Sequence, residues 1–200
     1  MNARRRKQGT RRAIGIIAED DSDIEVLSTL IDKIVQSHVP IMPAKGSGCG
    51  RIVRKCRAWA ENFKEQGCRY LLLVHDLDTP GSLHTLMTTL RSALDPSPIA
   101  CHIIVIPVLE IEAWLLADHQ AIQRAMKLKK ALKLIRNPEE VLNPKEHLRD
   151  LVIINSNKER RYINTIDNKK IAKECQIENL KRCASFVPFV EFIQRCLGAR

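Results

Sequence analysis

The sequence has no hydrophobic run of the roughly 18 residues that a transmembrane helix requires. The first residues, MNARRRKQGTRRAIGIIAEDD, place a basic stretch before an apolar one. However, AIGIIA is too short for the hydrophobic region of a signal peptide and runs directly into acidic residues. The sequence also lacks the GxxxxGK(S/T) pattern, so an ATP-type P-loop is not indicated. These absences predict a soluble, globular protein of the cytoplasm with no membrane partner.

The cysteines form no CxxC pair, and no second cluster has the spacing of zinc ligands. Seven cysteines is an odd number, and they are scattered from Cys49 to Cys196. Reduced thiols of this kind are typical of cytosolic proteins, where most of them behave as small core residues.

Basic residues outnumber acidic ones by 33 to 23, which gives a formal net charge of +10. Such an excess favours an anionic partner, such as nucleic acid or a nucleotide. Part of it lies in an N-terminal arm, residues 1–12, which is rich in arginine. The arm either contacts a polyanion or serves only to keep the chain solvated.

Short apolar segments alternate with helical patterns through residue 127. The segments 13–18, 69–76 and 99–107 read as buried strands, and 39–42 as a further short strand. The stretches between them, and residues 109–126, have the period of amphipathic helices. We therefore predict an α/β fold, with a mostly parallel, Rossmann-like sheet over residues 13–127 and helices on both of its faces. Residues 128–200 are expected to form a helical extension packed on this core.

Local signals place several helix starts. Ser22 and Glu25 have the spacing of a capping box, and Asn137 and Asn143 each precede a proline at an expected first helical position. Gly67 is expected at the end of the second helix. Residues 151–156 fit either a short strand or a continuation of the preceding helix.

Acidic residues follow the ends of three predicted strands. In a parallel sheet, sites form outside the carboxyl ends of the strands, so these side chains are expected at one edge. Asp76 and Asp78 point the same way in an extended chain and would repel each other without a cation between them. Hard oxygen ligands suit Mg²⁺ or Mn²⁺. The expected metal site comprises Glu19, Asp76, Asp78 and Glu112, with Glu110 as an additional acid.

Three of these acids also have a structural explanation, whereas Glu19 has no comparable local one. Asp78 precedes Thr-Pro-Gly and could form a turn or a helix cap, and Glu110 and Glu112 could stabilise the first turn of a helix. His75 could act as a general base or be a partly buried histidine beside a carboxylate. Asp118 could cap a following segment, and Trp114 is most simply a core residue.

The glycine-rich segment KGSGCGRIVRK precedes the second predicted helix. Its backbone N–H groups and basic side chains could contact a phosphate group, and the alternative is a flexible loop before a solvated basic helix. The expected phosphate contacts are Lys45, Gly46, Gly48, Arg51, Arg54 and Lys55.

A strand ending in Glu, followed by a strand ending in Asp-x-Asp, resembles the Toprim domain of topoisomerases, primases and overcoming-lysogenisation-defect nucleases. EIEAWLLAD, NPEEVLNPKEHL and SFVPFVEFI are similar to a family of small bacterial Toprim-like proteins, often associated with phage-defence or mobile loci. The resemblance implies that Glu19 is a general acid or base, that Asp76 and Asp78 hold Mg²⁺, and that Glu112 is an added acid. Asp20 departs from the glycine, and Pro80 from the third aspartate, of the Toprim pattern.

These observations predict a Mg²⁺-dependent nuclease or related phosphoryl-transfer enzyme that acts on DNA or RNA. The first alternative is a non-catalytic Toprim-like module that binds nucleotide, nucleic acid or a separate partner ATPase. A small-molecule phosphohydrolase is a further alternative. The sequence does not decide whether the chain forms a homo-oligomer.

Overall fold

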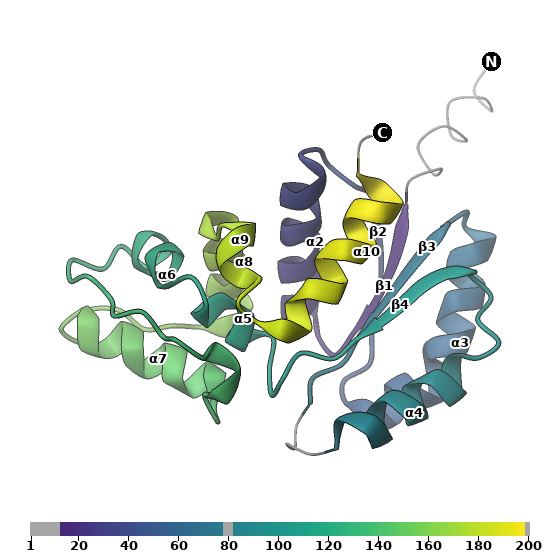
Figure 1. Ribbon diagram of the computed structural model, residues 1–200, viewed down its shortest axis with the longest axis horizontal. Helices are drawn as coiled ribbons and strands as arrows, with labels where there is room; N and C mark the ends of the chain where they lie inside the picture. The colour runs from purple at the N-terminus through teal and green to yellow at the C-terminus, as the bar shows by residue number, and fades with distance from the viewer. Residues whose placement is uncertain (1–12, 78–81, 199–200) are drawn as a thin grey trace.

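Four parallel strands form one sheet in the computed structural model, which describes residues 13–77 and 82–198. The sheet has the order β2-β1-β3-β4 (Figure 1). The central β1 is buried along its whole length, which is why its segment is apolar and rich in isoleucine. The strands are β1 (Ile14–Ala18), β2 (Ile41–Lys45), β3 (Tyr70–Val74) and β4 (Cys101–Val105).

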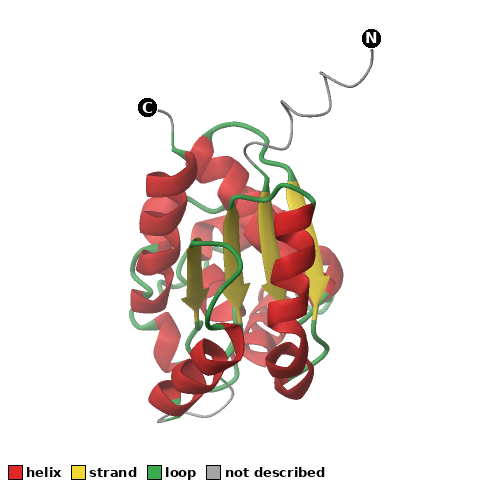
Figure 2. Cartoon of the chain, turned by 90° about the vertical axis from the view of Figure 1, so that its right-hand side faces the viewer, coloured by secondary structure: helices red, strands yellow, loops and turns green. Residues whose placement is uncertain are grey.

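Helices cover both faces of this sheet (Figure 2). Ile14 and Ile16 of β1 belong to a core cluster shared with α2 (Asp21–Val35) and α10 (Val187–Leu197). Ile17 points to the opposite face and joins a cluster with residues of α3 (Cys49–Glu65) and α4 (Leu83–Leu94). This alternation follows from the two-residue period of a strand. The predicted α/β fold with a parallel sheet is therefore confirmed.

The second half of the chain is helical in all its described elements after β4. These are α5 (Glu112–Leu116), α6 (His119–Ala125), the 3-10 turn η2 (Pro138–Glu140), α7 (Pro144–Asn155), α8 (Asn164–Glu174), α9 (Ile177–Leu180), the turn η3 (Ala184–Phe186) and α10. α8 packs against α2 and α6, and α7 packs against α5. The last helix, α10, returns to β4 and α2 beside the sheet (Figure 1). The helical extension thus shares the main hydrophobic core with the sheet.

The first helix begins differently from the prediction. Asp20, with an extended backbone, is the N-cap, and its carboxylate accepts a hydrogen bond from the Asp23 N–H (3.0 Å). The Asp23 side chain accepts from the Asp20 N–H in return (3.3 Å), which completes a capping box. The predicted pair serves tertiary contacts instead. The Ser22 hydroxyl donates to the Asn164 carbonyl, and Glu25 pairs with Lys169.

The boundaries of the other helices differ less from the predicted ones. The helix expected over 109–126 is divided into α5 and α6, with Asp118 as the N-cap of α6. Residues 151–155 continue α7 rather than form a strand. Asn137 and Asn143 do precede helical turns that open with proline, but neither side chain makes a capping hydrogen bond. Gly67, with φ of 90°, follows the end of α3 as expected.

Three predictions concern residues outside the described ranges. They are the basic arm (residues 1–12), the metal ligand Asp78 and the departure at Pro80. Among the described residues, no helix is long and apolar enough to cross a membrane.

Candidate functional site

The chain crosses from one side of β1 to the other between β2 and β3, which puts the topological switch point of the sheet at the carboxyl ends of β1 and β3. Glu19 directly follows β1, and Asp76 lies two residues beyond β3. The backbone N–H of Asp76 donates to Glu19 Oε1 at 3.1 Å. The sheet order therefore brings two of the predicted acids into direct contact.

His75 fixes the same glutamate. Its side chain is only 1% exposed, and Nδ1 lies 3.2 Å from Glu19 Oε1 and 2.7 Å from the Asp76 carbonyl oxygen. A carbonyl oxygen only accepts, so Nδ1 carries a hydrogen. The other ring nitrogen, Nε2, is buried and has no hydrogen-bond partner among the described residues.

Glu110 and Glu112 reach the site from the segment that follows β4. Glu112 is 2% exposed, and its Oε1 accepts a hydrogen bond from Asn168 Nδ2 at 3.0 Å. Lys145, in the first turn of α7, places Nζ 4.0 Å from Glu112 Oε1 and 3.9 Å from Glu110 Oε1. Its backbone N–H also donates to Glu110 Oε2 at 2.9 Å. The helical extension therefore contributes a cation and an amide to the acidic site.

A tyrosine closes this network on the side of the extension. Tyr162 is buried, hydrogen-bonds to Asn168 Oδ1, and places its hydroxyl 3.4 Å from Glu112 Oε1. Asn168 also donates to the hydroxyl of Ser22 on α2 (3.2 Å). Glu112 is thus held in one position by groups of the helical extension, and Asn168 is itself tied to α2 through Ser22.

The acids act on one another electrostatically. Burial raises the pKa of Asp76 well above its ordinary value, and the charges of Asp23, Glu112, Glu19 and Glu110 raise this pKa further. Burial, followed by Asp20 and Glu112, raises the pKa of Asp23 to about 8. Among the described residues, the predicted acids Glu19, Glu110 and Glu112 therefore lie within electrostatic reach of Asp76, and a cation would relieve their repulsion.

Sequence reasoning missed Asp23 and Lys145. Asp23 lies one helical turn after Glu19 in the acidic run EDDSD, so its position after β1 was a usable signal. Lys145 follows an Asn-Pro helix start, and nothing local distinguishes it from the other lysines of the extension.

The donor set suits a hard cation, although it is not a preformed cage. Among the described residues, no group of three His, Cys, Asp or Glu side chains is arranged to hold a metal ion. Mg²⁺ does not require one, because it keeps several waters and binds through one or two carboxylates together with substrate phosphate. Asp76 and its neighbours Glu19, Asp23 and Glu112 fit that mode of binding.

The glycine-rich loop differs from the expected phosphate cradle. The N–H groups of Gly46 and Ser47 donate to the carbonyl oxygens of Ala18 and Glu19, both at 2.9 Å, and so cannot bind phosphate. Gly46 is required by packing, since a Cβ atom there would lie 2.1 Å from Ile52 Cγ1. Lys45 is paired with Asp21. The loop therefore ties β2 to the end of β1.

The remaining basic residues of this segment lie on α3. Arg51, Arg54 and Lys55 are exposed. Arg54 extends back along the helix, because its Nη1 lies 3.3 Å from the position that a Cβ atom of Gly50 would occupy. These side chains can contact an anion at the surface.

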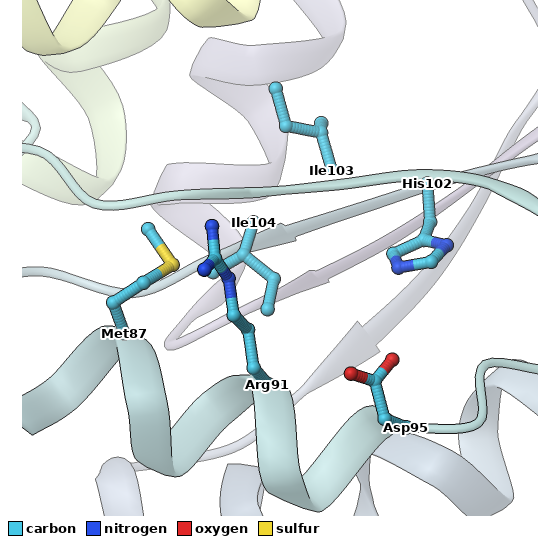
Figure 3. Close-up of a pocket in the computed structure, with 6 residues that line it drawn as sticks. All are labelled: Met87, Arg91, Asp95, His102, Ile103 and Ile104. Atoms are coloured by element: carbon cyan, nitrogen blue, oxygen red, sulfur yellow. The ribbon is translucent and has the colours of Figure 1, made fainter.

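A pocket of about 220 Å³ lies between α4 and β4, away from the acids (Figure 3). Arg91 of α4 and the C-cap residue Asp95 point toward β4, and His102 points from β4 toward α4. His102 Nδ1 is 2.9 Å from the Ile99 carbonyl oxygen. None of the predicted site residues lines this pocket.

The fold and the site define a parallel α/β protein with an acidic site at the switch point of its sheet, completed by a helical extension. The chain belongs to the family described as "Domain of unknown function (DUF4276)", whose model matches residues 18–194. The match spans both the strand-end acids and the extension that supplies Lys145. No curated protein and no solved structure matches the chain.

Proposed function

We propose that the protein is a Toprim-like nuclease, or a related phosphoryl-transfer enzyme, that uses Mg²⁺ or Mn²⁺ and acts on nucleic acid. The observation that carries this proposal is the gathering of Glu19, Asp23, Asp76 and Glu112 around the ends of β1 and β3. Desolvation and the neighbouring acids raise the pKa of Asp23 and of Asp76, which is costly for folding unless a cation binds there.

A bound Mg²⁺ would stabilise negative charge on the phosphate and lower the pKa of a bound water. Asp76, assisted by Asp23 or Glu112, supplies the oxygen ligands for it. Glu19 is held through Oε1 by His75 and by the Asp76 N–H, so its other oxygen, Oε2, can take a proton from the attacking water.

Lys145 provides a fixed positive charge at the same site. Burial alone would lower the pKa of Lys145, but Glu112 and Glu110 outweigh this effect and raise it. The ammonium group therefore stays protonated at neutral pH, where it can stabilise the charge on a phosphate oxygen.

The charge of the chain favours nucleic acid as the substrate. Arg51, Arg54 and Lys55 are exposed on α3, and the net charge of the chain is +10. Contacts of this kind hold the phosphate backbone without reading bases, and they weaken steeply as salt concentration rises.

Cleavage assays on panels of DNA and RNA, with Mg²⁺, Mn²⁺ or EDTA, test this proposal. We expect metal-dependent cleavage that falls at least about 100-fold in Asp76→Asn and in Glu19→Gln, because each removes a ligand or proton acceptor from the reacting centre. Glu25→Gln is the matched control. Glu25 lies on α2, half-exposed and paired with Lys169, and its variant is expected to retain activity.

Cleavage that survives both site substitutions would reject the proposal. Salt-sensitive binding of nucleic acid or nucleotide, with no turnover in any metal, would instead support the non-catalytic module.

A further inference from the structure

Two cysteines that are far apart in the sequence meet at the edge of the sheet. Cys101 is the first residue of β4, which is an edge strand, and Cys196 lies in the last turn of α10. Their Sγ atoms are 3.0 Å apart, although their positions in the chain differ by 95. Both side chains pack against the main hydrophobic core, and α10 contacts β4. The packing of α10 on the sheet therefore brings the two thiols together.

The two thiols are close enough to form a disulfide. The S–S distance of a disulfide is about 2.05 Å, so the sulfur atoms have to approach each other by about 1 Å. Cys196 is one residue from the end of α10, and a small shift of this last turn supplies the movement, because helix ends fray. A thiol–thiol hydrogen bond is the alternative, but S–H is a weak donor and sulfur a weak acceptor, so it holds the pair only weakly.

The pair is also open to a reagent in solution. Cys101 and Cys196 are partly exposed, whereas four of the other five cysteines are buried, namely Cys56, Cys68, Cys175 and Cys183. Burial, followed by Cys101, raises the pKa of Cys196 to about 11, and Arg195 lowers it in part. Reaction at Cys196 therefore begins from a small fraction of thiolate and is slow, so the equilibrium between thiols and disulfide is the quantity to measure.

We propose that Cys101 and Cys196 are a site of reversible oxidation by low-molecular-weight disulfides of the glutathione class. One cysteine loses its proton to solvent, and the thiolate attacks a sulfur of the oxidant, whose S–S bond breaks and releases a thiolate that takes up a proton. The second cysteine then attacks the mixed disulfide in the same way, forms the bond between the two cysteines, and releases the second thiol. Two electrons pass from the protein to the oxidant, and excess thiol reverses both steps.

The disulfide closes a long loop that carries one side of the acidic site. Glu112, Lys145 and Asn168 all lie between the two cysteines, so the bond ties the segment that contains them to the edge of the sheet. A disulfide that closes a long loop restricts the unfolded chain and so stabilises the folded one. In a reducing compartment such a bond is transient, and its formation then reports oxidation. The bond forms whether or not the acids bind a metal, and it is therefore independent of the proposed function.

Equilibration of the full, folded chain with mixtures of reduced and oxidised glutathione tests the site. The remaining thiols are alkylated, and disulfide-linked peptides are identified by mass spectrometry. We expect a peptide that joins Cys101 to Cys196 to be the main disulfide product, and to disappear when dithiothreitol is added in excess. With oxidised glutathione in excess, two alkylated thiols at these positions, or glutathione retained on either of them, would overturn the proposal.

Two serine variants assign the bond to this pair. Cys49→Ser is the matched control, because Cys49 is also partly exposed but lies at the start of α3. We expect this variant to form the linked peptide to the same extent as the unmodified protein. Cys196→Ser should instead retain glutathione as a mixed disulfide on Cys101. A linked peptide that is lost in Cys49→Ser would contradict the assignment.

Urea denaturation, after glutathione has been removed, measures the effect of the bond on the fold. We expect the midpoint of the unmodified protein and of Cys49→Ser to rise by about 1 M or more on oxidation, because the bond closes a long loop. The midpoint of Cys196→Ser should not rise. A linked peptide without a higher midpoint would reject the conclusion that the bond fastens α10 to the sheet.

Discussion

Asp20, Asp23 and Asp76 are the same residue type in three environments. Asp20 is exposed and caps α2. Asp23 forms the other half of that capping box, but it also faces Glu112 and Glu19, and its pKa is raised to about 8 by burial and by its acidic neighbours. Asp76 is at the centre of the site, with a pKa raised well above the ordinary value. Each role depends on which other acids lie within reach.

Asp23→Asn should stabilise the metal-free protein at pH 8. Because the pKa of Asp23 rises from 3.8 to about 8 on folding, the folded state keeps a proton that the unfolded state releases between these values. Ionisation of Asp23 in the folded state therefore lowers the free energy of unfolding, and this loss grows as pH rises through the window. Asparagine cannot ionise and so avoids the loss. We expect a gain of about 1 to 2 kcal/mol at pH 8, and little change at pH 4.

Urea denaturation with EDTA at both pH values measures this gain. Asp21→Asn is the control, because Asp21 is exposed on the same helix and its pair with Lys45 is at the surface, where such pairs contribute little. A lower free energy of unfolding for Asp23→Asn at pH 8 would show that repulsion among the acids is not a cost of folding.

At the scale of the elements, Asp118 explains why the helical pattern after β4 forms two helices. Asp118 is 1% exposed and caps α6 through the Ala121 N–H (3.0 Å). Its other oxygen accepts from the Gln176 N–H (2.9 Å) and from Asn179 Nδ2 (3.0 Å), at the start of α9. A continuous helix would move this carboxylate away from α9, so a tertiary contact overrides the local periodicity.

Asp118→Asn should destabilise the protein at neutral pH. Burial alone would raise the pKa of Asp118, but the hydrogen bonds from Gln176, Asn179 and Ala121 outweigh it and lower the pKa. Since the folded pKa is depressed, this stabilisation is present above about pH 4 and is lost as pH falls through the lowered value. We expect the free energy of unfolding to fall by about 2 kcal/mol at pH 7. Asparagine loses the charge-assisted hydrogen bonds, and its NH₂ group, a donor, would face the donor groups that Asp118 accepts from.

Urea denaturation at pH 7 and pH 3 checks the expected dependence. The difference between the variant and the unmodified protein should shrink at the lower pH. Asp150→Asn, at an exposed position of α7, is expected to change stability at neither pH. A difference for Asp118→Asn that is unchanged at pH 3 would contradict the role of the ionised carboxylate.

At the scale of the whole molecule, one aromatic cluster joins the two halves of the chain. The ring of Trp114, in α5, lies 5.0 Å from that of Phe186 and 5.9 Å from that of Phe189. All three side chains are fully buried, in the same core as Ile14 and Ile16 of β1. Since α10 also covers one face of the sheet, the helical extension is an integral part of the fold.

The chain should therefore unfold in a single transition. Trp114 fluorescence, measured in a Trp59→Phe background, and far-UV circular dichroism are expected to give coincident curves through the same urea titration. Phe186→Ala should lower the free energy of unfolding by about 3 to 5 kcal/mol while keeping the curves coincident. Two separated transitions would indicate that the extension folds independently of the sheet.

The sequence by itself determined the alternation of strands and helices, because burial on both faces requires apolar, β-branched strands and amphipathic helices have a 3.6-residue period. It also placed Glu19, Asp76 and Glu112 at one edge, because parallel strands end on the same side. Only the tertiary structure brought Lys145, Asn168 and Tyr162 to these acids and engaged the N–H groups of Gly46 and Ser47 at the end of β1. Local patterns encode period and capping, whereas contacts between distant segments depend on how whole elements pack.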